Sequence, residues 1–296
     1  MEKITAIIVT YNPDTSVLMK AIMAIYYQVN DILIIDNGSN NFTKIKKLLG
    51  SNTKYSKIKI YKLRSNMGLP YALNLGITRA LKKEPAWILT LDQDTIIKQR
   101  IIRTILYQYG KLPDDIRNAV GILAMKSSTN KNIGINKLFG GESLLENRIG
   151  TFCYKNYAIT SGNLVKSKLL ISGLRFNNNL FIDFVDLDFN FRIRRAGYII
   201  LEYVVIGMSH IVGILDKNNV SFEPLPRIYY IARNATYLMS YQKFPIRFGI
   251  YNIFLWCIIY LRVKGISTMP RLLKVVFLGI YDGLTGKMGK SKMAVT

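Results

Sequence analysis

Short apolar segments rich in Ile and Val alternate with segments of helical periodicity through the first third of the chain. The apolar segments lack polar alternation, which is typical of strands that are buried on both faces of a parallel sheet. We expect strands over residues 4–10, 31–36, 58–63 and 86–91, and helices over residues 17–28, 42–49 and 71–81. Strands that alternate with helices in this way predict an α/β fold.

Polar residues follow three of these predicted strands. They are Tyr11-Asn12, Asp36-Asn37-Gly38-Ser39 and Asp92-Gln93-Asp94. In open α/β sheets, ligands bind outside the carboxyl ends of the strands. We therefore expect the three clusters to line one crevice.

The pattern changes in the rest of the chain. A helix is expected over residues 185–196, ending at Gly197, followed by a strand over residues 199–205. Three helices are expected over residues 228–241, 248–264 and 271–281, separated by Pro245 and Pro270. We interpret residues 1–215 as an α/β domain and residues 216–296 as a helical extension.

The chain is strongly basic, with 41 Lys and Arg against 18 Asp and Glu and a formal net charge of +23. Residues 217–296 carry ten of these net charges and are about twice as basic per residue as the rest. Such a charge indicates a polyanionic partner: nucleic acid, an anionic membrane or a phosphorylated substrate. The uncharged stretch from Phe248 to Leu261 is expected to be too short to span a membrane.

Asp92 and Asp94 follow a strand and supply the oxygen ligands that Mg²⁺ or Mn²⁺ prefers. Taken alone, the pair also fits a solvated loop. Asp36 can accept a hydrogen bond from a ribose or a base, or can close a turn in which Gly38 has positive φ. The segment from Asn66 to Gly68 can expose backbone amides to a ligand, or can simply cap a helix.

The densest acidic cluster lies at the start of a predicted helix and contains Asp183, Asp186 and Asp188 among Phe, Val and Ile. Acids at the edge of an apolar site have shifted pKa values, as a general base requires. The alternative is ordinary helix N-terminal charge that pairs with Arg192 and Arg195.

His210 is the only histidine, so any imidazole role at a metal or a diphosphate falls on it, although it also fits a structural hydrogen bond. No P-loop motif occurs, and no G-x-G-x-x-G follows the first strand. The widely separated Cys153 and Cys257 indicate neither a disulfide scaffold nor a thiolate zinc site.

Several blocks in order resemble the inverting glycosyltransferases of family 2, which have the GT-A fold, and among them the bacterial rhamnosyltransferase-like branch. The blocks are Ile8-Val-Thr-Tyr-Asn12-Pro, Asp36-Asn-Gly-Ser39, Asn66-Met-Gly68, Leu91-Asp-Gln-Asp94-Thr, Ser161-Gly-Asn163 and Asp186-x-Asp188-x-x-x-Arg192-x-x-x-x-Gly197. Arg233-Asn234 and Asp282-Gly283 are similar to features of that branch's tail. The resemblance implies a Rossmann-like mixed sheet flanked by helices, with a helical, basic C-terminal extension.

The resemblance also implies roles for individual residues. Nucleotide-sugar donor binding is implied for Thr10, Tyr11, Asn12, Asp36, Asn66, Gly68 and Asp92, and metal binding for Asp92, Asp94 and His210. Contacts with the sugar or acceptor are implied for Gly162, Asn163, Asp183 and Arg192. Asp186 matches the catalytic base, with Asp183 as the competing candidate, because Val185 stands where the family usually has Glu.

The reaction implied is metal-dependent, inverting transfer of a sugar, with rhamnose from dTDP-rhamnose favoured and UDP-galactose or UDP-glucose as other donors. The basic tail with aromatic residues such as Trp256 suits the cytoplasmic face of a membrane, where a lipid-linked saccharide would be the acceptor. Ordinary core packing is the alternative for this tail. A nucleotidyltransferase or a nucleic-acid-binding protein fits the sequence less well, because the expected motifs are missing.

Overall fold

A computed structural model describes residues 2–49, 55–128, 148–209, 214–215 and 221–291 of the 296-residue chain. Its main element is a ten-stranded sheet in the order β3-β2-β1-β4-β9-β6-β10-β8-β7, with β5 paired to β10. The strands are β1 Ile4–Thr10, β2 Asp31–Asp36, β3 Ile58–Lys62, β4 Trp87–Asp92, β5 Ile96–Ile97, β6 Val120–Ser127, β7 Arg148–Ile149, β8 Phe152–Lys155, β9 Asn163–Lys166, β10 Ile199–Ser209, and the separate pair β11 Ile214–Leu215 and β12 Ser221–Phe222. The α-helices are α1 Thr15–Tyr26, α2 Phe42–Leu49, α3 Leu69–Leu81, α4 Ile101–Gly110, α5 Asp114–Ala119, α7 Ser167–Ile171, α8 Val185–Arg195, α9 Leu225–Tyr241, α10 Ile246–Lys264 and α11 Met269–Leu284.

The sheet is mixed, as the resemblance to the GT-A fold implies, whereas the apolar runs alone indicate a parallel sheet. Strands β3, β2, β1 and β4 are parallel, and β6 is parallel to β10. Strand β9 lies antiparallel between β4 and β6, while β8 lies antiparallel to β10. The predicted bounds of β1 and β2 are confirmed residue for residue, and β4 begins and ends one residue later than expected.

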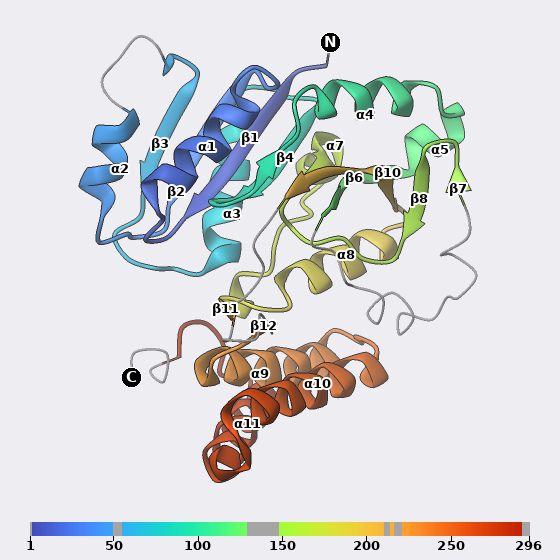
Figure 1. Ribbon diagram of the computed structural model, residues 1–296. Helices are drawn as coiled ribbons and strands as arrows, with labels where there is room; N and C mark the ends of the chain where they lie inside the picture. The colour runs from blue at the N-terminus through green and yellow to red at the C-terminus, as the bar shows by residue number, and fades with distance from the viewer. Residues whose placement is uncertain (1, 50–54, 129–147, 210–213, 216–220, 292–296) are drawn as a thin grey trace.

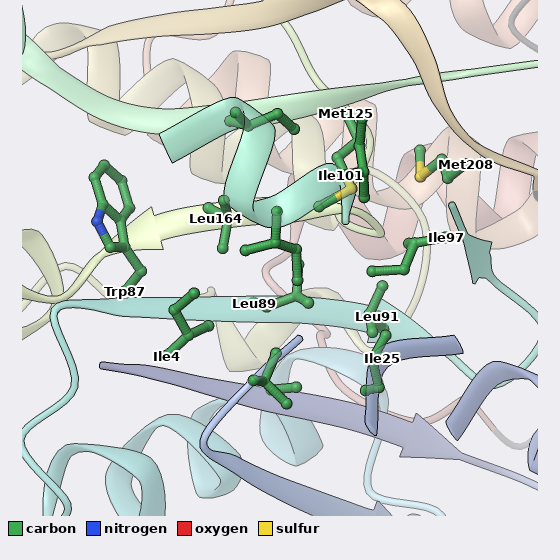
Figure 2. Packing of buried hydrophobic residues seen from close by; sticks show 14 of the residues in the cluster. Ile4, Ile25, Trp87, Leu89, Leu91, Ile97, Ile101, Met125, Leu164 and Met208 are labelled. Atoms are coloured by element: carbon green, nitrogen blue, oxygen red, sulfur yellow. The ribbon is translucent and has the colours of Figure 1, made fainter. Parts of the chain in front are cut away.

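Helices cover both faces of the sheet, so both faces of its central strands are buried. Ile4 of β1 and Leu89 of β4 face a core that includes Ile25 of α1 and Ile101 of α4, as Figure 2 shows. Ile7 of β1 instead faces the core formed with α3, α7 and α8. This two-sided burial explains why these strands read as continuous apolar runs.

The last three α-helices form a layer at the lower end of the view in Figure 1. Helix α9 also contributes Ile231, Ala235 and Leu238 to the core on the α3 and α8 side of the sheet. The boundary at residue 215 therefore marks a change of architecture, and the division into two domains stays a prediction.

The uncharged stretch from Phe248 to Leu261 lies within a helix that is longer than the stretch itself. Helix α10 begins directly after Pro245 and runs for 19 residues to Lys264. Among the described residues it is the one helix long and apolar enough to cross a membrane, by length and composition alone. One side of it is buried in the protein through Phe248, Gly249 and Asn252.

Candidate active site

The loops that follow β1, β2 and β4 meet at one edge of the sheet. The Tyr11 amide donates a hydrogen bond to Gln93 Oε1 at 2.8 Å, and the Asn12 amide donates to Ser39 Oγ at 2.8 Å. The Tyr11 side chain is 45% exposed, and Asn12 is exposed too. The predicted convergence of the three polar clusters is thus present, with Tyr11 and Asn12 at its surface.

Asp36 lies beneath this surface and is fully buried. Its Oδ1 accepts from the Thr10 hydroxyl at 3.2 Å, and its Oδ2 accepts from the Ser39 amide at 3.0 Å. Gly38 has a φ of +83°, and a Cβ there would lie 2.4 Å from the carbonyl carbon of Ser65. The carboxylate of Asp36 therefore closes the turn, and its contact with a nucleoside stays a prediction.

Asn66 and Gly68 tie the loop after β3 to its neighbours. Asn66 Oδ1 accepts from Asn37 Nδ2 and from the Gly68 amide, both at 3.0 Å, and the Met67 amide donates to Asn37 Oδ1 at 2.9 Å. Gly68 has a φ of +91°, and a Cβ there would lie 2.7 Å from the carbonyl oxygen of Phe181. The loop that carries Asn66 thus packs directly against the start of the acidic cluster.

Asp92 and Asp94 are both half-buried at the end of β4. The Asp92 amide donates to Ser161 Oγ at 2.9 Å, and that oxygen lies 2.7 Å from Thr95 Oγ1. The Ser161 hydroxyl therefore fixes the backbone of the acidic loop to the block that contains Gly162 and Asn163.

Gly162 and Asn163 lie beside β4 at the start of β9. The Gly162 amide donates to the Thr90 carbonyl at 2.8 Å, and Asn163 pairs with Thr90 in the antiparallel register. The Asn163 side chain is buried and donates to the Ile159 carbonyl at 2.7 Å. In this structure Asn163 supports the loop before β9.

That loop, residues 156–162, connects the acidic cluster to the strand ends. The Tyr157 hydroxyl donates to Asp186 Oδ2 at 2.6 Å, and four residues later Ser161 holds the Asp92 amide. Four residues span about 14 Å at most. Asp186 therefore belongs to the same region as Asp92 and Asp94.

Asp186 is half-buried in the first turn of α8. Burial raises the pKa of Asp186, and the negative charge of Asp183 adds to that rise. The hydrogen bonds from the Tyr157 hydroxyl and the Leu187 amide lower the same pKa in part, because they favour the carboxylate. The result is a carboxylate with a raised proton affinity at the start of a helix.

Asp183, three residues earlier, is held by an arginine of α9. Arg227 Nε donates to Asp183 Oδ2 at 2.7 Å, and Arg227 Nη2 donates to Asp183 Oδ1. Arg227 Nη1 lies 3.4 Å from Glu223 Oε2. Burial, opposed by Arg227, raises the pKa of Glu223 to about 7.

The backbone around Asp183 is also held by α9. Phe181, Asp183 and Phe184 have φ values of +62°, +61° and +61°, which non-glycine residues rarely adopt. The side-chain amide of Asn234 donates to the carbonyls of Leu180, Ile182 and Asp183 at 2.9, 2.7 and 2.9 Å. Asn234, which the sequence singled out only through a resemblance, therefore lies directly behind the acidic loop.

Arg192 lies on another face of α8 from Asp186, because six residues separate them. Its Nε and Nη2 donate to Asp188 Oδ2 at 3.0 and 2.6 Å. Asp188 is 1% exposed, and burial raises its pKa despite the pairing with Arg192. The alternative pairing expected for Arg192 is therefore present, and its contact with a sugar stays a prediction.

The described residues include no group of three or more His, Cys, Asp or Glu side chains able to hold a metal ion. Two carboxylates on one loop nevertheless fit Mg²⁺ or Mn²⁺, which commonly take one or two protein carboxylates plus substrate phosphates. The residues that would hold the ion are Asp92 and Asp94. His210, the third predicted ligand, lies outside the described residues.

Tyr157, Glu223 and Arg227 were not predicted from the sequence. Tyr157 lies 29 residues from Asp186, and Arg227 lies 44 residues from Asp183. Neither belongs to a recognisable motif, and Arg227 is one of many cations in a basic tail. Only the packing of the loop before β9 and of α9 brings them to the acidic cluster.

Comparisons with known proteins agree with this arrangement. The chain is 28% identical over 256 residues to the dTDP-rhamnosyl transferase RfbF of Shigella flexneri, covering 84% of each chain. TarS 1-349 of S. aureus, solved in complex with UDP-GlcNAc, matches with a TM-score of 0.56 at 13% identity, over 92% of this chain and 79% of that one. The mannosyltransferase PcManGT of Pyrobaculum calidifontis, solved with GDP-Man and Mn²⁺, matches with a TM-score of 0.56 at 15% identity, over 99% of this chain and 77% of that one.

The two structural likenesses confirm the GT-A fold. The model of the family described as glycosyl transferase family 2 matches residues 5–159. This match spans more than half of the chain and includes the loops of Asp36, Asn66 and Asp92. The strand-end loops are therefore those of a sugar-transferring enzyme, and the chain belongs to glycosyl transferase family 2.

Proposed function

We propose that this glycosyltransferase moves rhamnose from dTDP-rhamnose, with inversion, onto a lipid-linked saccharide in bacterial surface polysaccharide synthesis. The observation that carries the donor assignment is the likeness to RfbF, a dTDP-rhamnosyl transferase, over 256 residues. A match of that length extends past residue 215 into the helical tail. It therefore includes more than the nucleotide-binding half of the chain.

In this proposal the exposed residues Tyr11 and Asn12 contact the nucleoside. Thr10 and the buried Asp36 hold the loop of Tyr11 and Asn12 and lie next to the nucleoside. Asn66 and Gly68 complete the donor side, since their loop is bonded to the loop of Asp36. A bound Mg²⁺ or Mn²⁺ would supply charge neutralisation for the leaving diphosphate. Asp92 and Asp94 are the residues that would hold it.

Asp186 is the proposed general base. Its raised pKa favours uptake of the acceptor hydroxyl proton while the hydroxyl oxygen bonds to the anomeric carbon. In the same displacement the bond from that carbon to the diphosphate oxygen breaks, on the opposite face. Gly162 and Asn163 are the proposed contacts to the sugar or acceptor, because the loop of residues 156–162 is bonded to this base through Tyr157.

A donor screen with nucleotide sugars tests the proposed substrate. We expect nucleoside diphosphate release with dTDP-rhamnose in the presence of Mg²⁺ or Mn²⁺, measured by a coupled assay. Release with UDP-galactose, UDP-glucose, UDP-GlcNAc or GDP-mannose instead would reject rhamnose as the donor sugar.

The metal role of Asp94 is tested separately. We expect Asp94→Asn to weaken metal-dependent binding of the nucleoside diphosphate and to leave the fold intact, because Asp94 lies in a loop at the end of β4. Isothermal titration with and without Mg²⁺ measures the change, and Asp115→Asn, an exposed acid of α5, is the control. Equal metal-dependent affinity in Asp94→Asn and in the wild type would place the ion elsewhere.

We also propose that the tail binds the cytoplasmic surface of an anionic membrane, which would bring a lipid-linked acceptor to the site. Helices α10 and α11 present exposed apolar residues, termed here the apolar tail surface: Ile246, Ile250, Phe254 and Ile258 of α10, and Leu273, Phe277, Tyr281 and Leu284 of α11. Arg247, Arg262, Lys264, Arg271 and Lys274 are exposed on the same helices. Apolar residues that recur about every four positions, with cations beside them, favour a helix that lies in the membrane interface.

A further inference from the structure

We infer that Arg227 of α9 is a positioning residue for sugar transfer: it holds Asp183 in a two-pronged ion pair and so leaves Asp186 as the carboxylate that receives the proton. This inference rests on the proposed function, since it takes Asp186 as the base. It adds that a residue of the C-terminal helices completes the catalytic site.

The geometry of the two acids supports this division. Both oxygens of Asp183 accept from Arg227, and the Asp183 side chain is only 10% exposed. Asp186 instead accepts from the neutral hydroxyl of Tyr157 and from the Leu187 amide. Both oxygens of Asp183 are therefore bound by a cation, whereas both oxygens of Asp186 are bound by neutral donors.

The charges around Asp186 come from three segments. Asp183 lies on the loop just before α8, and Tyr157 lies on the loop before β9. Arg227 lies in the first turn of α9, and Glu223 lies two residues before that helix begins. The pKa of Tyr157 is raised well above its ordinary value by burial and by Asp186, so its hydroxyl stays protonated and donates. Arg227 is therefore the cation that offsets the negative charge of Asp183 next to Asp186.

Removal of Arg227 would leave that negative charge uncompensated. The pKa of Asp186 would rise, because a second carboxylate close by disfavours its ionised form. A base acts only when deprotonated, so the acidic limb of the pH profile of kcat/KM would move to higher pH. Removal of Asp183 as well would move the limb back.

The loop itself does not depend on the Arg227 side chain alone. Asn234 holds the carbonyls of Leu180, Ile182 and Asp183 from the same helix, and Gly68 packs against Phe181 from the donor side. We therefore expect Arg227→Gln to fold and to keep its affinity for the donor.

The experiment measures pH profiles of kcat/KM for transfer with the full chain and donor affinity by titration. Arg227→Gln should shift the acidic limb upward by about one pH unit, which is a loss of about tenfold in kcat/KM on that limb. The double variant Asp183→Asn/Arg227→Gln should return the acidic limb to its wild-type position. Arg227→Lys should leave the limb close to that position, because lysine keeps the positive charge. The matched control is Arg117→Gln, which removes the exposed ion pair with Asp114 on α5.

An unshifted limb in Arg227→Gln, with donor affinity unchanged, would overturn the inference. Loss of transfer in Asp183→Asn greater than in Asp186→Asn would also overturn it, by making Asp183 the base. If Arg227→Gln does not fold, Asp183→Asn tests the inference by itself, because this change should move the acidic limb to lower pH. Full transfer by Asp186→Asn would instead reject the base in the proposed function, which separates the two failures.

Discussion

At the residue scale, Asp183 and Asp186 differ in their partners rather than in their chemistry. One is bound by an arginine and the other by a tyrosine hydroxyl. We expect Asp186→Asn to lower transfer by about 10²- to 10⁴-fold, the range for loss of a general base. Donor affinity should stay unchanged, because the donor loops do not depend on Asp186.

Steady-state transfer rates together with donor titration check this prediction. Asp115→Asn is the control, since it removes an exposed carboxylate on α5. A small loss of rate accompanied by a large loss of donor affinity would assign Asp186 to donor binding instead.

Glu223 yields a prediction about stability. Its pKa is raised from 4.5 to about 7 in the folded chain, so the folded state binds the proton more tightly than the unfolded chain does. The stability that neutral Glu223 provides is fully present when the pH is below the pKa of Glu223 in the unfolded chain. It is lost as the pH rises through the folded pKa of about 7. The loss is on the order of 3 kcal/mol.

Because glutamine stays neutral, Glu223→Gln should flatten this dependence. Thermal unfolding of both proteins at about pH 5 and about pH 8 measures it. We expect the Tm of the wild type to fall relative to that of Glu223→Gln as pH rises. Parallel changes in the two Tm values would contradict the raised pKa.

At the scale of elements, the contact between α9 and α11 depends on two glycines of α11. A Cβ on Gly279 would lie 2.7 Å from the Tyr229 carbonyl oxygen, and one on Gly283 would lie 2.5 Å from the Arg233 carbonyl oxygen. Both clashes are with helix backbone, so a helix must shift. Since α9 also carries Asn234, such a shift would reach the acidic loop.

We expect Gly283→Ala to destabilise the protein by about 1 to 3 kcal/mol, the usual cost of overpacking, and to lower transfer as well. Gly110→Ala is the matched control, because Gly110 is also helical and has open space around its Cβ position. Chemical denaturation of the two variants measures the difference. Equal stability of the two variants would show that α9 and α11 pack less closely than described.

At the scale of the whole molecule, charge and exposed apolar area coincide on the tail. Phe254 is 63% exposed on α10 and Phe277 is 66% exposed on α11, both within the apolar tail surface. The opposite side of α10 is occupied, since a Cβ on Gly249 would lie 2.5 Å from Met239 Sδ. A helix with one side buried in protein favours attachment in the plane of the membrane over crossing it.

We expect the protein to sediment with anionic vesicles at low salt and to be released at high salt, because basic residues contribute roughly 1 kcal/mol each at such a surface and are screened by ions. Phe254→Ser/Phe277→Ser should weaken sedimentation and leave donor hydrolysis unchanged. Ile171→Ser, which removes an apolar side chain that is 71% exposed on α7, is the control. Resistance to extraction by salt and carbonate would indicate that α10 inserts deeply.

The sequence by itself determined the nucleotide-binding half of the fold. The bounds of β1 and β2 and the convergence of Tyr11, Asp36 and Asp92 followed from apolar runs that end in polar residues. Such signals are local: burial on both faces selects β-branched residues, and the parallel arrangement brings the strand ends to one edge. The helices of the tail were also predictable, because their periodicity is local.

Only the tertiary structure decided what surrounds the proposed base. The acidic loop and the base are contacted by three residues that lie 29 to 54 residues away in the sequence: Tyr157, Arg227 and Asn234. No motif or spacing in the sequence predicts these contacts. The burial of Asp36 and the pairing of Arg192 with Asp188 were likewise open alternatives until the packing was known. The physical reason is that a side chain's hydrogen-bond partners and its desolvation depend on which elements pack against it, and that packing is a property of the whole fold.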